Sequence, residues 1–150
     1  MRVKDVDIAE NFLKRDGRLN RWRYFKRVFV LGFAEMLLLT AAVAATADEN
    51  GALSTVGIVL YKGIGLAALV PFFCLAVRRL HDVNRDETLA YILFALNVAM
   101  SLFFDDDFSV TESSFMESLL AAAATLIGLY MLLCPGTAGD NQYGTDPLEE

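Results

Sequence analysis

Four long runs of apolar residues, separated by shorter polar segments, dominate the sequence. They cover residues 28–47, 52–77, 88–104 and 118–134. Charged residues are almost absent from them, since Glu35 interrupts the first run, Lys62 interrupts the second, and the last two contain none. A helix of about 20 residues, within a range of roughly 17–25, crosses the ~30 Å hydrocarbon core of a membrane. The pattern therefore predicts an all-α membrane protein in which four transmembrane helices form a bundle.

Two other interpretations explain the apolar runs less well. A soluble helical bundle needs a polar stripe on each helix to face water, and residues 89–104 and 119–133 offer none. The small residues at positions 45–47 resemble the cleavage site of a signal peptide. However, the basic leader before the first run is 27 residues long, and Glu35 interrupts the run itself. We therefore expect this segment to be a retained helix.

The polar segments at the two ends divide the chain into three parts. We expect a leader at residues 1–27, the four-span bundle at 28–134, and a turn-rich tail at 135–150. Residues 3–15 of the leader predict a short amphipathic helix that Gly17 can end. Asn20 is a favourable N-cap for the helix that follows. Beyond it, aromatic residues alternate with basic ones, which is typical of the water–lipid interface; they are Trp22, Tyr24 and Phe25.

Charge is distributed unevenly along the chain. Of 150 residues, 55% are hydrophobic and 21% are charged, and the net charge is −6. Nine of the thirteen Lys and Arg residues precede the first run, three lie between the second and third runs, and the other two loops have none. Because Lys and Arg gather in cytoplasmic loops, we predict that both termini are cytoplasmic. The basic residues lie beside apolar runs and not on a soluble face, so we expect no binding to nucleic acid.

Three polar motifs stand at the predicted cytoplasmic ends of the runs. They are GRLNRWRYF at 17–25, RRLHD at 78–82 and GDNQYGTDP at 139–147. In this order, and over nearly the whole chain, they resemble the domain of unknown function 805 family of small bacterial inner-membrane proteins. The resemblance implies a bacterial inner membrane and implies no activity. The turn at 83–89, VNRDETL, is more charged than the family pattern and lacks its tryptophan pair.

The three motifs share one predicted side of the membrane, so they can meet in a single patch. If residues 78–82 continue the second helix, Arg78 and Asp82 share a face, and we expect them to interact with Asp146. One hypothesis is that the patch is a structural lock. Another is that it binds an anionic lipid headgroup or an acidic segment of a protein partner, because basic residues beside a membrane attract anionic lipid. The patch residues are Arg18, Arg21, Arg78, Arg79, His81, Asp82, Asp140, Asn141, Tyr143 and Asp146.

An enzymatic interpretation finds less support in the sequence. His81 and Asp82 are adjacent, so on a helix their side chains point about 100° apart and cannot pair. A base at His81 would take its carboxylate from the tail. Neither a nucleophile motif nor a known metal-ligand spacing is present, and Cys74 and Cys134 stand alone. We expect no enzymatic activity, and hence no catalytic residue, metal or cofactor.

Glu35 and Lys62 are the charged residues inside the apolar runs. Counted from positions 47 and 52, their depths are about 18 and 15 Å, so we predict an intramembrane ion pair. The alternative is a protonated Glu35 with Lys62 solvated separately. The sequence thus favours a non-enzymatic binding or scaffold module that contacts anionic lipid or a protein partner through the patch. The alternative function is a small transporter or channel that uses Glu35 and Lys62, formed as a homo-oligomer through small-residue helix faces.

Overall fold

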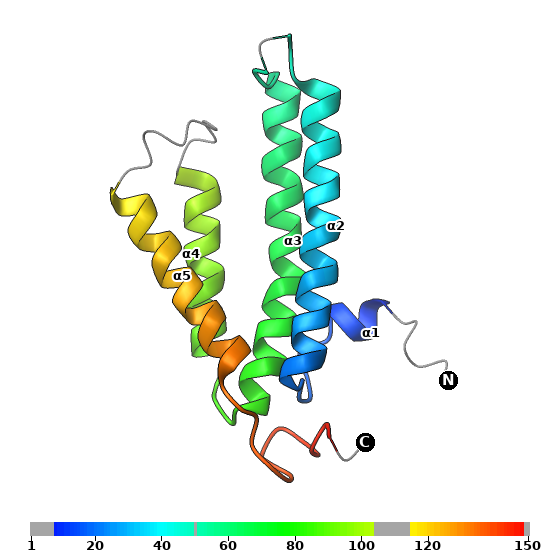
Figure 1. Cartoon of the computed structure of the whole chain (residues 1–150), viewed down its shortest axis with the longest axis vertical. Coiled ribbons are helices and arrows are strands. Elements are labelled where there is room, and N and C mark those ends of the chain that lie inside the picture. Colours follow the sequence, from blue (N-terminus) through cyan, green and yellow to red (C-terminus); the bar gives the residue numbers. More distant parts are fainter. Residues whose placement is uncertain (1–7, 50, 104–114, 149–150) are drawn as a thin grey trace.

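The computed structural model describes residues 8–49, 51–103 and 115–148, and these residues form five helices without a strand among them. The helices are α1 (Ile8–Phe12), α2 (Arg21–Thr46), α3 (Thr55–Asp82), α4 (Thr88–Phe103) and α5 (Phe115–Leu133). In Figure 1, α2 and α3 form one long pair, α4 and α5 form a shorter pair, and the two pairs converge below. We call this lower end, where α2 begins and α3 and α5 end, the motif end.

Polar side chains set where the two longest helices begin. The side chain of Asn20 accepts a hydrogen bond of 2.8 Å from the backbone N–H of Arg23, which confirms it as the N-cap of α2. Ser54 caps α3 in the same way, at 3.2 Å from the N–H of Gly57. Helix α3 then continues through the RRLHD motif to Asp82, as the face-sharing argument assumed. Of the predicted leader helix, residues 3–7 lie outside the described residues.

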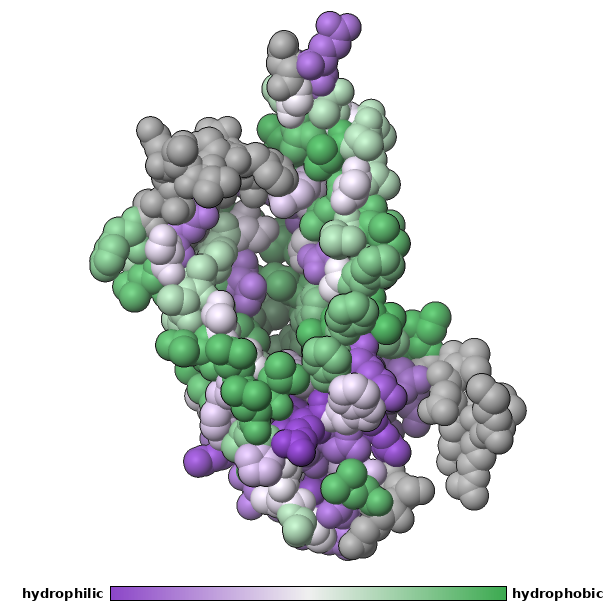
Figure 2. Space-filling model, viewed as in Figure 1, coloured by the Kyte–Doolittle hydropathy of each residue, from purple (hydrophilic) through white to green (hydrophobic). Residues whose placement is uncertain are grey.

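Three of the helices have the length and composition to cross a membrane. These are α2, α3 and α5, whereas α4 is apolar but has only 16 residues. Within the most hydropathic stretch of α2, no residue is buried inside the protein. Figure 2 shows this apolar surface on the helices above the motif end, where polar residues gather instead. Because apolar surface of this extent is covered in its native setting, the fold is that of a multi-pass membrane protein.

The closely packed core lies at the motif end. Tyr24 belongs to this core and not to the exposed aromatic group with which the sequence grouped it, since it is only 8% exposed. A cavity of about 380 Å³ borders this core at Tyr24, Ala76 and Ala90 and extends between the helices to Glu35. The core is thus concentrated where the sequence motifs are. Its buried apolar members are Leu19, Tyr24, Leu75, Ala76, Val77, Leu80, Ala90 and Met131.

The register of α2 against α3 separates Glu35 from Lys62. A Cβ atom on Gly57 would lie 2.2 Å from Oγ1 of Thr46, so these two residues face each other directly. Counted from this contact, Glu35 lies about 16 Å and Lys62 about 8 Å along the pair. The predicted depths of the two residues are level because they count the second helix from residue 52, whereas α3 begins at Thr55.

Candidate functional site

The three sequence motifs meet at the motif end, where backbone hydrogen bonds join distant parts of the chain. The N–H of Leu19 donates to the carbonyl of Arg78 at 3.0 Å, which fixes the leader against the end of α3. The N–H of Thr137 donates to the carbonyl of Asp82 at 2.8 Å, which fixes the tail to the same helix end. The predicted meeting of the leader, the RRLHD motif and the tail is therefore present.

The carboxylate of Asp82 lies between two buried guanidinium groups. Arg18 approaches one oxygen through Nε and Nη2, both at 3.3 Å. Arg79 bonds the other oxygen through Nη1. Asp82 and Arg79 are 2% and 0% exposed, so this charge contact is shielded from solvent. We call Arg18, Arg79 and Asp82, with the carbonyl groups that they contact, the arginine cluster.

Backbone carbonyls occupy the remaining donors of the two arginines. Arg18 donates to the carbonyls of Thr137 and Gly139, each at 2.5 Å. Arg79 donates to the carbonyl of Met131 at 2.7 Å and also to that of Cys134. The last carbonyls of a helix have no partner within it, and a cation placed there also interacts favourably with the helix dipole. The cluster therefore closes the end of α5 and holds the tail, and its polar groups are satisfied by the protein itself.

Gly136 makes room for the cluster. It follows Pro135 in the turn after α5, and a Cβ atom at this position would lie 2.3 Å from Oδ2 of Asp82. A contact of that length forces the carboxylate or the turn to move, because the displaced atom belongs to a buried and fully bonded group. The position therefore requires glycine for reasons of space.

His81 is fixed on several sides. Its Nδ1 atom lies 3.2 Å from the carbonyl oxygen of Gly17, and its ring stacks on Tyr143 with centroids 3.9 Å apart. Its other nitrogen, Nε2, lies 3.8 Å from Oε1 of the Glu87 carboxylate. This differs from the prediction that such a carboxylate would come from the tail, because the loop before α4 folds back across the end of α3. The tail contributes the aromatic ring instead.

The tail is an ordered loop held by its own polar side chains. Asn141 donates from Nδ2 to the carbonyl of His81 at 2.9 Å. The carboxylate of Asp146 accepts hydrogen bonds from the N–H groups of Leu148 and Gly139, at 2.9 and 2.8 Å. These two backbone donors favour the ionised form and lower the pKa of Asp146 below its usual range. Asp140 accepts a bond of 3.2 Å from the N–H of Asp146.

Arg78 and Arg21 were predicted as patch residues, and neither belongs to the arginine cluster. Arg78 donates from Nη1 to the carbonyls of Glu10 and Asn11, at 3.3 and 3.4 Å, and so contacts the end of α1. The guanidinium groups on Asp82 are therefore those of Arg18 and Arg79 and not the predicted Arg78. The reason is helical phase, since positions three apart share a face as well as positions four apart. Arg21 is exposed and borders a surface cavity of about 400 Å³ beside the tail.

Residues outside the predicted patch complete the site. Thr137 supplies a carbonyl to Arg18 and binds the carbonyl of Asp82, yet it lies outside all three motifs. Glu87 belongs to the charged turn that departs from the family pattern, and it accepts a bond of 2.5 Å from Arg15. Arg15 also donates to the hydroxyl of Tyr91 at 3.0 Å. The unusual charge of that turn could have indicated these contacts from the sequence, because a carboxylate in the turn can pair with a basic side chain of the leader.

The comparisons with known proteins agree with this arrangement of motifs. A family model described as "Protein of unknown function (DUF805)" matches residues 12–145, which include every residue of the arginine cluster. No curated protein and no solved structure matches the chain. Within the described residues, no group of three or more His, Cys, Asp or Glu side chains is arranged to hold a metal ion.

Proposed function

Because this chain belongs to the DUF805 family, whose description gives no function, we propose a function from the geometry of the motif end. The protein is a non-enzymatic membrane protein that binds anionic lipid headgroups through the basic start of α2. The observation that carries this proposal is an exposed group of basic and aromatic side chains that begins three residues after Arg18 of the arginine cluster. We call this group the basic collar; it comprises Arg21, Trp22, Arg23, Phe25 and Lys26.

The contacts within the basic collar suit a membrane surface. Trp22 is 60% exposed and stacks on Phe25 with ring centroids 5.7 Å apart. The ammonium of Lys26 lies over the Trp22 ring at 5.1 Å. Tryptophan favours the headgroup level of a bilayer, and each basic residue there adds about 1 kcal/mol of attraction to anionic lipid. The collar therefore combines an interfacial anchor with a surface of positive charge.

The arginine cluster supports the collar without binding a ligand itself. The donors of Arg18 and Arg79 described above are used by Asp82 and by backbone carbonyls, and both arginines are buried. What they provide is rigidity, since the segment that leads into α2 is bonded to the end of α3. A fixed helix start reduces the entropy lost when a headgroup binds.

The topology that we propose has four spans with both termini in the cytoplasm of a bacterium, in the inner membrane. Helix α4 serves as the fourth span, and its 16 residues extend about 24 Å. The orientation rests on the basic residues, twelve of which lie in the leader or in the loop after the second apolar run. The bacterial inner membrane rests on the family resemblance of the three motifs.

The environment of His81 favours a non-enzymatic function. A general base needs a nitrogen that can reach a substrate, and His81 is only 6% exposed. Tyr143 stacks on its ring, and its Nε2 atom lies 3.8 Å from the carboxylate of Glu87. These contacts suit a side chain that holds the tail against α3.

The single tryptophan of the chain provides the test, because its fluorescence reports on the collar alone. The full chain is placed in bilayers that contain brominated phosphatidylglycerol or brominated phosphatidylcholine, which quench a nearby tryptophan. We expect phosphatidylglycerol to quench Trp22 more strongly at equal mole fraction. The preference should weaken in high salt, because salt screens exposed charges.

A pair of matched variants identifies the residues responsible. The double variant Arg21→Gln/Arg23→Gln should lose the preference, because it removes two charges beside the reporter. The control Lys14→Gln/Arg85→Gln removes two exposed charges elsewhere and should retain it. Equal quenching of the native protein by both lipids would overturn the proposal and would point to an acidic segment of a protein partner as the ligand of the collar.

A further inference from the structure

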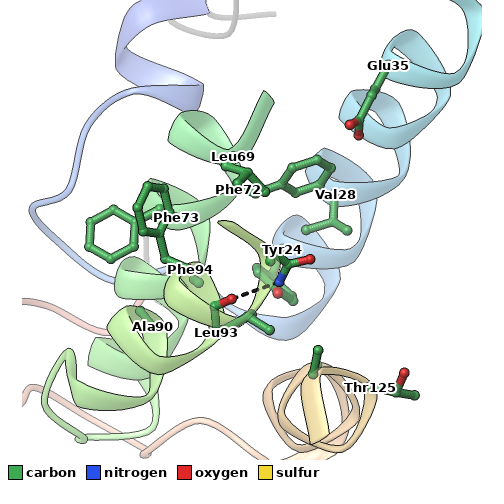
Figure 3. A pocket seen from close by; sticks show the side chains of 14 residues that line it. Tyr24, Val28, Glu35, Leu69, Phe72, Phe73, Ala90, Leu93, Phe94 and Thr125 are labelled. Carbon is green, nitrogen blue, oxygen red and sulfur yellow. Dashed lines mark hydrogen bonds between the residues drawn. The ribbon is translucent and has the colours of Figure 1, made fainter. Parts of the chain in front are cut away.

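The cavity between the helices is lined by no residue of the arginine cluster, and all four long helices contribute to it. Its volume of about 380 Å³ falls within the roughly 300–1,000 Å³ that is typical of small-molecule sites. Glu35 of α2, Phe72 of α3 and Asn97 of α4 line it, and α5 closes it with Ala124 and Gly128. Figure 3 shows Glu35 and Phe72 directed toward the same space between the helices.

The charge in this cavity has one sign. Glu35 provides a carboxyl group, and none of the described residues that line the cavity is Lys, Arg or His. A charged side chain at the centre of a membrane costs roughly 2.5–3.5 kcal/mol by insertion scales, and the cost falls when it is paired or solvated. The register of the helices places Lys62 about 8 Å along the pair from Glu35, so a cationic ligand could supply a complementary charge directly within the cavity.

Aromatic and aliphatic side chains form most of the remaining wall. The ring of Phe72 packs one turn from Glu35, since its Cζ atom lies 3.9 Å from the Cβ position of Gly32. Leu69, Leu93 and Phe94 continue the apolar lining. The face of an aromatic ring attracts a cation, and the attraction is stronger away from water. The wall therefore suits an apolar body attached to a single positive charge.

Glu35 is also accessible from outside the bundle. It borders a second cavity of about 530 Å³, which is lined by residues of α2 and by Tyr61 of α3 alone. This second cavity lies on the surface of the helix pair, within the apolar region that faces lipid. A molecule dissolved in the bilayer can thus meet the carboxyl group without passing through the motif end.

We propose that the cavity binds a lipophilic monocation, such as an amine or quaternary ammonium with an apolar body, whose charge pairs with Glu35 beside the ring of Phe72. An inorganic cation fits the site poorly, because hard metal ions require about six oxygen ligands and this wall is mostly apolar. The inference concerns a different surface from the basic collar and does not depend on it.

Two probes of nearly identical shape test the proposal. Benzyltrimethylammonium carries the charge, and neopentylbenzene replaces its nitrogen with carbon and is neutral. Binding of each to the detergent-purified full chain is measured by calorimetry. We expect the cation to bind at least tenfold more tightly than its neutral counterpart. Equal affinity for the two probes, or tighter binding of the neutral one, would overturn the proposal.

Variants then locate the site. Glu35→Gln should weaken binding of the cation at least tenfold and leave binding of the neutral probe unchanged. Glu117→Gln removes a carboxyl group from α5 that does not line the cavity, and it should bind the cation as the native protein does. Unchanged cation binding by a folded Glu35→Gln protein would refute the assignment.

A cavity-filling variant keeps the test decisive if Glu35→Gln does not fold. Ala124→Leu places a larger side chain in the cavity from α5 while Glu35 remains present. This variant should lose binding of both probes and keep the melting temperature of the native protein. If it binds the cation as tightly as the native chain does, the ligand lies elsewhere and the proposal fails.

Discussion

Helix α3 has very different surroundings at its two ends. Near the motif end, Cys74 to Val77 and Arg79 to Asp82 are all buried, whereas in the half nearer the hairpin tip Gly57 is the one described residue that is buried. The first end is surrounded by the leader, α5 and the tail. The other end contacts mainly α2, and its apolar side chains face outward.

This difference reflects the solvent around each end. Lipid chains are as apolar as leucine, so apolar contacts between helices gain little hydrophobic free energy within a membrane. Helices there can remain loosely packed around a cavity. At the membrane boundary, a buried arginine without partners would be costly, and once bonded it holds several segments in one geometry. The polar end therefore determines how the four long helices meet.

The largest effect that we expect comes from breaking the arginine cluster at Arg79. Arg79→Met leaves two carbonyls at the end of α5 without a donor and leaves Asp82 with one guanidinium partner. Removing one member of a buried charge pair typically costs 3–5 kcal/mol, so we expect a loss of about 3 kcal/mol or more. The measurement is the free energy of unfolding in mixed detergent. The control is Arg85→Gln, because Arg85 is exposed. Equal stability of the two variants would contradict the view that the arginine cluster holds the motif end together.

A smaller effect should follow from crowding the same cluster. Gly136→Ala directs a methyl group at the carboxylate of Asp82, and overpacking of this kind typically costs 1–3 kcal/mol. The matched control is Gly63→Ala in α3, where no heavy atom lies within 4 Å of the new Cβ. The control should be neutral or slightly stabilising, because alanine favours a helix. The melting temperatures of Gly136→Ala and Gly63→Ala compare the arginine cluster with the middle of α3. A lower melting temperature for Gly63→Ala alone would contradict the view that the cluster is the more tightly packed of the two.

The smallest effect concerns pH and the tail. Backbone hydrogen bonds from Leu148 and Gly139 lower the pKa of Asp146 in the folded protein, and an unfolded aspartate titrates near about 3.9. The stabilising contribution is therefore complete above that value and is lost as the pH falls through the lower, folded pKa. As the pH is lowered from 6 to 3, the difference in melting temperature between the native protein and Asp146→Asn should therefore decrease. A constant difference across this range would show that ionisation of Asp146 does not contribute.

The sequence was informative about helices and about which segments converge. Apolar runs indicated α2 and α3 because a membrane helix needs uninterrupted apolar length, and Asn20 indicated the start of α2 because few residues cap a helix well. The convergence of the three motifs followed from the charge rule. These features depend on local chemistry that neighbouring residues determine.

Other features depended on rotations and registers that the sequence does not specify. Whether Arg78 or Arg79 meets Asp82 is decided by the phase of one helix against its neighbours. The offset between Glu35 and Lys62 is decided by how many residues the hairpin turn uses before α3 begins. The carboxylate near His81 comes from Glu87 because a loop folds back, which no periodicity in the sequence indicates.

The bonds of Arg18 also have a consequence for the order in which the protein is made. Its acceptors at Thr137 and Gly139 are synthesised about 120 residues after the arginine itself. At typical rates of 5–20 residues per second, this delay is roughly 6 to 24 s. During that time the leader has no carbonyl groups from the tail to bind. The contacts that join Arg18 to the tail can therefore form only after all of the helices between them have been synthesised.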